Sequence, residues 1–240
     1  MITLIVGDTG VGKTALNMLF LLREYEQQRH WLLRNAINKI EHWNRTRKRK
    51  LSIPTQVPIY SSFEVKIHTG YKKWFKPYDI NPEKVGVPDE SAPPDTEFLL
   101  PLAKVHLSEV QNVWDSRASN MPIYQSKLFE EGRHFGMDFV LDAQRGGRID
   151  LNIRGIAHLI IEVQYMEHIK DEYGDTVKTT WHCREFSEIR EYEYYLSSGE
   201  GYKETTYEYE GNIFDFYNST SCEKEFIPPE GQDFSLRIKA

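Results

Sequence analysis

The chain opens on an unbroken run of aliphatic and β-branched residues, Ile2 to Val6, without the alternation that marks a half-exposed strand. Such a run predicts a strand buried on both faces, as in the centre of a parallel sheet. A helical pattern of apolar side chains then extends from Lys13 to about Lys48. Because no Gly or Pro interrupts this pattern, it predicts one long helix or a helical hairpin.

Apolar runs alternate with one more helical pattern over the next part of the chain. The runs predict strands at residues 57–65, 103–107, 137–141 and 156–163. The helical pattern covers residues 123–134. Strands that alternate with helices indicate an α/β fold with a mostly parallel central sheet flanked by helices. Residues 66–101, rich in Pro, Asp and aromatic residues, predict an irregular insertion that is either functional or poorly ordered.

The pattern and the charge of the sequence change in its last third. Tyr173-Gly174-Asp175 lies between two strand-like segments and is a hairpin signal. Acidic residues greatly outnumber basic ones between residues 185 and 230. We therefore predict two parts: a core of residues 1–163, and an extension of residues 164–240 that carries an antiparallel β-hairpin and an acidic surface.

The composition fits an ordered globular protein, with 240 residues, 40% of them hydrophobic, and a net charge of −6. No apolar stretch reaches the roughly 18 residues of a transmembrane helix. Asp8 and Lys13 interrupt the region where a secretory signal would lie. The two cysteines, Cys183 and Cys222, form neither a disulfide framework nor a metal cluster, so we expect a cytoplasmic protein. Binding to nucleic acid would have to depend on local basic patches.

The strongest motif is a complete G-x-x-x-x-G-K-T sequence between the first strand and the first helix. Its glycines let successive backbone N–H groups converge on the β-phosphate of a nucleotide. Lys13 then reaches the β- and γ-phosphates, and the Thr14 hydroxyl is placed to bind Mg²⁺. The positive end of the following helix faces the same anion. The motif predicts that a nucleoside triphosphate binds to Gly7, Asp8, Thr9, Gly10, Val11, Gly12, Lys13 and Thr14.

A second acidic motif is needed to distinguish the classes of enzyme that share this loop. In most ATPases of this kind an Asp holds Mg²⁺ through water, and the next Glu polarises the attacking water. The apolar run 103–107 leads into Ser108 and Glu109, so Ser108 stands in the place of the Asp. A serine can hydrogen-bond a Mg²⁺-bound water without supplying charge, which predicts weakened metal affinity or hydrolysis. Asp142 is a competing position for the acid, but it has no adjacent Glu and lies two residues before Gln144, which favours the next strand.

Gln144 and several arginines are further candidates for catalysis. An amide at the end of a neighbouring strand can donate to the γ-phosphate and accept from the attacking water, which is the role we predict for Gln144. Ring-forming ATPases also need a cation supplied by a neighbouring subunit, and Arg suits this role because it is always ionised. Arg133, near a helix end, and Arg117, close after the acidic motif, are the leading candidates; a surface ion pair is the alternative for each.

One dense basic cluster lies at the end of the first helical pattern. It can contact DNA phosphates independently of sequence, or simply complement a helix dipole. The cluster consists of Arg45, Arg47, Lys48, Arg49 and Lys50.

Several of these motifs, taken in order, resemble the zonula occludens toxin-like (Zot) ATPases. The resemblance covers most of residues 1–163. It rests on the phosphate loop and on the segments 108–111, 128–139, 143–144, 149–154 and 214–219. In that family the second motif usually reads D-E-A-Q, and R-H precedes a glycine, as Arg133 and His134 do here. The family includes assembly ATPases of filamentous phages and lies close to the FtsK/HerA group of DNA-pumping motors.

The resemblance implies an ATP-hydrolysing motor of a virus or mobile element that translocates or packages DNA during virion assembly. It implies ATP and Mg²⁺ as cofactors, a homo-oligomeric ring, DNA as a partner, and a viral capsid, portal or assembly protein as another. The chain lacks the transmembrane helix of filamentous-phage members, so we expect it in the host cytoplasm, with any virion or membrane association through a partner. The alternatives are an extrusion ATPase at the inner membrane, a weakly hydrolysing nucleotide-regulated scaffold, and, less favoured, a small-molecule kinase.

Overall fold

The computed structural model describes residues 1–27, 41, 45, 58–65, 78–100, 102–117, 121–144 and 146–216. The predicted continuation of the first helix towards Lys48 therefore lies outside the described residues, except for two helical positions, Glu41 and Arg45. Of the basic cluster, only Arg45 is described.

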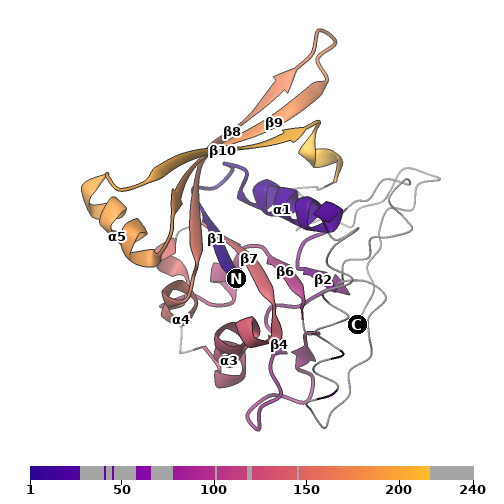
Figure 1. Cartoon of the computed structure of the whole chain (residues 1–240), viewed down its shortest axis with the longest axis vertical. Coiled ribbons are helices and arrows are strands. Elements are labelled where there is room, and N and C mark those ends of the chain that lie inside the picture. The colour runs from indigo at the N-terminus through magenta and orange to yellow at the C-terminus, as the bar shows by residue number, and fades with distance from the viewer. Residues whose placement is uncertain are drawn as a thin grey trace, which may run out of the picture.

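An eight-stranded sheet of order β10-β9-β8-β1-β7-β6-β2-β3 forms the centre of the molecule (Figure 1). Neighbouring strands run parallel from β8 to β3, whereas β9 and β10 are antiparallel additions at one end. This confirms the predicted α/β class, with a mostly parallel sheet and an antiparallel C-terminal part. The strands are β1 (Ile2–Val6), β2 (Ile59–Ser61), β3 (Tyr78–Asp79), β6 (Lys104–Leu107), β7 (Asp138–Ala143), β8 (Leu159–Lys170), β9 (Thr176–Phe186) and β10 (Lys203–Glu210).

The described part of the predicted insertion, residues 78–100, is irregular except for short strands. It contributes β3 to the edge of the main sheet and forms a separate two-stranded parallel pair. That pair consists of β4 (Val85–Gly86) and β5 (Glu97–Phe98).

Helices cover both faces of the sheet, which explains the unbroken apolar run of β1. On one face, Ile5 packs with α1 (Lys13–Gln27). On the other face, Leu4 belongs to the core that includes α3 (Ile123–Gly132) and α4 (Leu151–Gly155). Short 3-10 turns complete the described chain at Val110–Asn112, Arg133–Phe135, Gly146–Arg148 and Ile213–Asp215.

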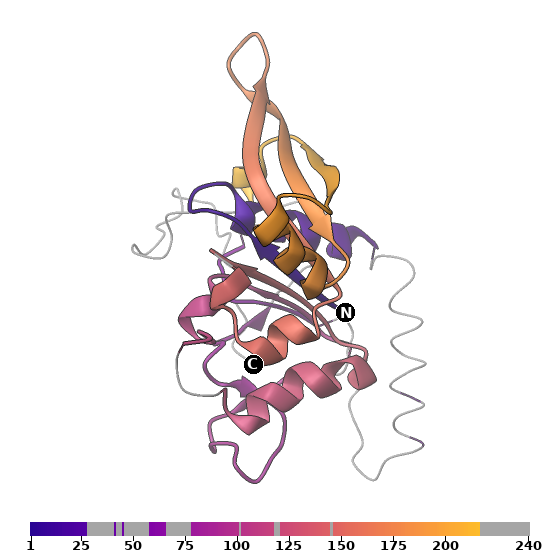
Figure 2. The same ribbon diagram turned by 90° about the vertical axis from the view of Figure 1, so that its left-hand side faces the viewer.

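The predicted hairpin is present, and its strands are long. β8 and β9 run on beyond the helical layers to a turn at Tyr173-Gly174-Asp175, where Gly174 has a φ of 89° (Figures 1 and 2). The predicted boundary between residues 163 and 164 falls inside β8, where the pairing with β9 shifts register. No helix in the described part of the chain has the length and apolar character needed to cross a bilayer.

The helix α5 (Ile189–Ser198) was not indicated by the sequence pattern. It lies in the tyrosine-rich segment, whose residues favour strands by propensity. Tyr192 and Tyr195 lie on one face of the helix and both contact the ring of Phe186. Burial of this aromatic face against the sheet therefore outweighs the local preference, and Gly199, with a φ of 77°, ends the helix.

Candidate active site

The phosphate loop occupies the turn between β1 and α1, and its three glycines all have positive φ values at which other residues would be strained. Gly7 and Gly12 have φ values of 151° and 91°. A Cβ on Gly7 would lie 2.6 Å from the Val163 carbonyl oxygen, and one on Gly12 would lie 2.7 Å from the Met166 sulfur. The surrounding backbone and side chains therefore fix the curled path of the loop, which is the shape needed to turn its N–H groups towards an anion.

Lys13 is almost completely buried at the base of this loop, with 5% of its surface exposed. Its ammonium group donates a hydrogen bond to the Asp8 carbonyl at 2.8 Å. The lysine thus folds back across the loop, so its charge lies where bound phosphates would be. An ammonium group held in this place acts as a compact positive charge for a phosphate oxygen.

Three oxygen-bearing side chains meet where α1 begins. The Thr14 hydroxyl lies 2.9 Å from that of Ser108. Ser108 donates to Asp142 Oδ1 at 3.0 Å, and Thr14 Oγ1 lies 3.5 Å from the same oxygen. The competing acid of the sequence analysis therefore joins the cluster that contains Ser108.

Asp142 is held by a network of neutral donors. The Glu109 backbone N–H donates to Oδ1 at 3.1 Å, and the Asn17 amide donates to Oδ2 at 3.1 Å. Asn17 also contacts His106 Nδ1 at 2.9 Å, which fixes the direction of its amide. Complete burial raises the pKa of Asp142 to about 6, and the hydrogen bonds from Glu109, Asn17 and Ser108 oppose this rise.

Glu109 and Gln144 come together just beyond the ends of the neighbouring strands β6 and β7. Gln144 Nε2 lies 3.5 Å from Glu109 Oε2, and its backbone N–H donates to Gln111 Oε1 at 3.3 Å. The Gln111 amide in turn donates to Glu109. Glu109 adopts a left-handed backbone with φ of 55°, an unfavourable conformation for a residue other than glycine. Its carboxylate contacts the Gln111 and Gln144 amides, and Gln144 lines a cavity together with Gly7 and Asp8 of the phosphate loop.

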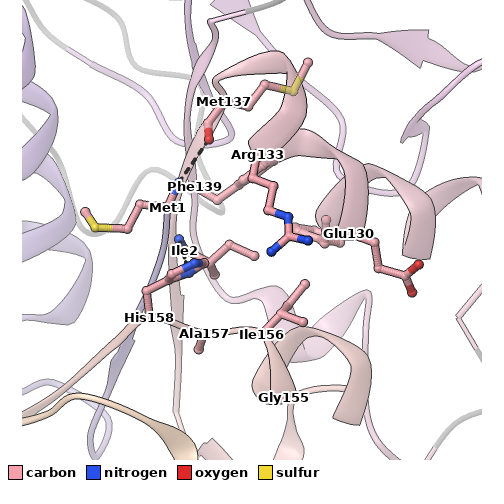
Figure 3. Close-up of a pocket in the computed structure, with 11 residues that line it drawn as sticks. Met1, Ile2, Glu130, Arg133, Met137, Phe139, Gly155, Ile156, Ala157 and His158 are labelled. Atoms are coloured by element: carbon pink, nitrogen blue, oxygen red, sulfur yellow. Dashed lines mark hydrogen bonds between the residues drawn. The ribbon is translucent and has the colours of Figure 1, made fainter.

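Arg133 and Arg117 lie elsewhere. Arg133 lines a cavity of about 420 Å³ together with Met1, Glu130 and His158, where β1 begins rather than where it ends (Figure 3). Arg117 pairs with Asp115 at 3.0 Å, and this contact lowers the pKa of Asp115 to about 2. In the described part of the chain, neither arginine is hydrogen-bonded to the phosphate loop. Their supply to a neighbouring subunit stays a prediction.

A second cavity, of about 450 Å³, adjoins the phosphate loop. Its volume is within the range of small-molecule sites. Gly7 and Asp8 line it from the loop, Gln144 from the end of β7, and Tyr192 and Leu196 from α5. Sequence reasoning did not connect α5 with this site, because only the path of the sheet brings them together.

The β8–β9 hairpin is anchored beneath the phosphate loop by Trp181. This side chain is fully buried, and its indole N–H donates to the Gly12 carbonyl at 3.0 Å. The two residues are 169 positions apart in the sequence, so no local pattern could have indicated the contact. The conformation of the loop therefore depends on the extension as well as on the core.

We expect Trp181→Phe to weaken nucleotide binding several-fold, because it removes a hydrogen bond worth about 1 kcal/mol from the loop. Titration with ATP and Mg²⁺ measures the affinity, and thermal unfolding measures stability. Trp114→Phe is the matched control: Trp114 is also buried and donates to Gln125 at 2.9 Å, in the core cluster that includes α3. The control should lose stability and keep its affinity; an equal loss of affinity in both variants would contradict the anchoring role.

The oxygen cluster has the chemistry that Mg²⁺ prefers. Thr14, Ser108 and Asp142 offer two hydroxyls and one carboxylate, which are hard ligands, and Mg²⁺ is usually held by few protein oxygens together with waters and phosphates. Within the described residues, no group of three or more His, Cys, Asp or Glu side chains could hold a metal ion. The Thr14, Ser108 and Asp142 oxygens fit a metal ion that a bound nucleotide would bring.

Comparison with known proteins gives the fold. No protein-family model matches the chain, and no curated protein matches it by sequence. Among solved structures, the N-terminal domain of zonular occludens toxin from Neisseria meningitidis has a TM-score of 0.53 and 16% identity, covering 90% of this chain and 98% of that one. The chain has a Zot-like P-loop NTPase fold. This confirms the resemblance that the motifs indicated, at the level of the fold.

A second solved structure is a weaker match. It is the genome packaging NTPase B204 from Sulfolobus turreted icosahedral virus 2 in complex with ATP-gammaS. The TM-score is 0.37 and the identity 11%, over 78% of this chain and 91% of that one. The assignment of the Zot-like fold rests on the toxin domain, not on this weaker likeness.

Proposed function

We propose that this chain is a subunit of an ATP-hydrolysing, ring-forming motor of a virus or mobile element, which translocates or packages DNA during virion assembly. The observation that supports hydrolysis best is the meeting of Glu109 and Gln144 beside the phosphate loop. A carboxylate and an amide in this place are suited to deprotonate and orient an attacking water. Simple nucleotide binding would require neither group.

Each residue of the site then has a separate task. The loop N–H groups and Lys13 bind the phosphates and stabilise the charge that develops on them. Glu109 accepts the proton of the attacking water, and Gln144 orients that water. Thr14 holds Mg²⁺, which when bound would neutralise phosphate charge.

Ring formation and DNA binding extend the proposal beyond one subunit. Arg133 and Arg117 lie away from their own phosphate loop, which suits a cation that acts on a neighbouring subunit's nucleotide. Arg45, the described member of the basic cluster, has 79% of its side chain exposed and pairs with Glu41 at 3.6 Å. An exposed pair of this kind is weak and can be exchanged for a DNA phosphate. A capsid, portal or assembly protein is the further partner proposed.

A nucleotide-regulated scaffold with feeble hydrolysis is the second candidate, and Ser108 in the usual Asp position is the observation that favours it. In that case ATP binds tightly and turns over hardly at all. An extrusion ATPase at an inner membrane would use the same chemistry as a packaging motor, and flotation of the protein with anionic vesicles would separate these two.

The test is to measure phosphate release and oligomeric mass together, with and without ATP, Mg²⁺ and double-stranded DNA. We expect an oligomer in the presence of ATP and a hydrolysis rate that rises several-fold with DNA. DNA stimulation should fall with salt, because phosphate contacts release counterions. A monomer that binds ATP, ignores DNA and does not hydrolyse would favour the scaffold, and absence of nucleotide binding would contradict both.

A further inference from the structure

The register of the sheet places Asp142 beside Ser108, one strand nearer to the phosphate loop. β7 lies between β6, which leads into Ser108, and β1, which leads into the loop. Leu107 of β6 pairs with Leu141 of β7. The residues that follow, Ser108 and Asp142, therefore stand at the same height on parallel strands. On its other side Asp142 pairs with Ile5 of β1.

The Asp142 carboxylate is fully buried, and every hydrogen-bond partner recorded for it is neutral. The donors are the hydroxyls of Ser108 and Thr14, the Asn17 amide and the Glu109 backbone N–H. Buried carboxylates are normally paired with a cation or bound to a metal, because an uncompensated charge is costly in the interior. Among the described residues, no cation forms a hydrogen bond or an ion pair with this carboxylate.

We propose that Asp142 supplies the carboxylate for Mg²⁺ that Ser108 lacks. The acid that the second motif usually carries then lies on the neighbouring strand, β7, in this chain. The proposal rests on the proposed nucleotide-binding function and names the metal-associated residue of the same site. Thr14 and Asp142 then bind the metal from α1 and β7.

In this arrangement Ser108 supports Asp142 as a hydrogen-bond donor, and its presence in the usual Asp position does not mean that the site has lost its acid. The Ser108 hydroxyl lies 3.0 Å from Asp142 Oδ1. An aspartate at position 108 would bring a second carboxylate into the same buried space, where two like charges cannot both stay ionised easily. A small neutral donor is therefore the residue type that position 108 tolerates beside an acid at 142.

The rival explanation is that Asp142 only fixes local structure, by accepting hydrogen bonds from Asn17 and from the Glu109 backbone. Both explanations predict that changing Asp142 alters stability. Only the metal role predicts that it changes how strongly Mg²⁺ tightens nucleotide binding, and only that role predicts rescue by a carboxylate at position 108.

The experiment measures the affinity for AMPPNP by calorimetry in excess Mg²⁺ and in EDTA, for four proteins: the unaltered chain, Asp142→Asn, Ser108→Asp, and the exchange Ser108→Asp with Asp142→Ser. Binding of Mn²⁺ to each AMPPNP complex, followed by electron paramagnetic resonance, reports the metal directly. Circular dichroism establishes folding.

We expect Asp142→Asn to lower Mn²⁺ affinity and the Mg²⁺-dependent gain in AMPPNP affinity by about 10- to 100-fold, the usual effect of removing a group that supports a metal site. Affinity in EDTA should stay the same. The exchange variant should recover most of the lost Mn²⁺ affinity and Mg²⁺ dependence. Ser108→Asp alone should not raise Mn²⁺ affinity, since the carboxylate is already present at position 142.

Two results would overturn the proposal: an unchanged metal dependence in Asp142→Asn, or a tenfold gain in Ser108→Asp alone. The second result does not depend on the folding of any Asp142 variant. If the unaltered chain binds AMPPNP in neither condition, the proposed function fails; if it binds with normal Mg²⁺ dependence and Asp142→Asn does the same, only this inference fails.

Discussion

Lys13→Ala should abolish nucleotide-dependent turnover, with a loss in kcat/KM of at least about 10³-fold. The loss of one preorganised donor to developing charge typically costs 10²- to 10³-fold. Lys13 also supplies a positive charge next to the Asp8 carbonyl, to which its ammonium group donates. Its removal should therefore affect both the binding of the triphosphate and the reaction. Phosphate release and a titration with a fluorescent ATP analogue measure the two effects.

The matched control is Lys127→Ala. Lys127 lies on α3 and pairs with Asp89 of the insertion. This variant loses a lysine and an ion pair without touching the phosphate loop, so turnover should stay the same. Full turnover by Lys13→Ala, or an equal loss in both variants, would show that the loop does not act on a nucleotide.

Glu109→Gln should have the second largest effect, and a different one. Hydrolysis should fall by about 10²- to 10⁴-fold, the usual contribution of a general base. Nucleotide affinity should change little, because glutamine keeps the size of the side chain and its carbonyl oxygen can still accept from Gln111 and Gln144. Single-turnover hydrolysis and nucleotide titration separate the two quantities. The variant should also accumulate in the ATP-bound state, which suits it for measuring ring size.

Glu130→Gln provides the corresponding control for this prediction. Glu130 lies on α3, where it accepts from Ser126 at 2.8 Å. Its amide variant should hydrolyse ATP at the unaltered rate. Should Glu109→Gln retain more than a tenth of that rate, another group must act as the base, and the strained backbone at Glu109 would need a different explanation.

The phosphate loop could be predicted from the sequence because all its parts are consecutive. Residues 7–14 contain the glycines, the lysine and the hydroxyl, and the strand and helix on either side are apolar patterns of ordinary kind. The order of strands and helices that follows then predicts the α/β class. Local spacing is sufficient where the chemistry is local.

The cluster at Asp142 could be raised only as an alternative, since it depends on sheet register. The sequence shows that Ser108 and Asp142 both follow apolar runs, but not that their strands pair with Leu107 opposite Leu141. Likewise, the sequence does not show that Arg133 lies near the start of β1 rather than near its end. These relations depend on tertiary structure, and the spacing of apolar residues along the chain does not predict them.

The helix α5 and the anchor Trp181 were missed for a related reason. Tyrosines favour strands by propensity, yet Tyr192 and Tyr195 gain more by packing on Phe186 from a helix. Trp181 is an ordinary aromatic residue of a strand until the hairpin folds under the phosphate loop. The Trp181 contact joins segments that are far apart in the sequence, and α5 depends on aromatic packing against the strand that precedes it.

The β8–β9 hairpin joins the phosphate loop to an exposed turn. Trp181, in the middle of β9, donates to the Gly12 carbonyl, while Tyr173 at the turn is 80% exposed. Thermodynamic reciprocity applies to two sites that are coupled in this way. If the nucleotide bound at the loop alters the affinity of the turn for a partner, then binding of that partner alters nucleotide affinity by the same factor. The hairpin would then couple nucleotide binding at the loop to partner binding at the turn, in both directions.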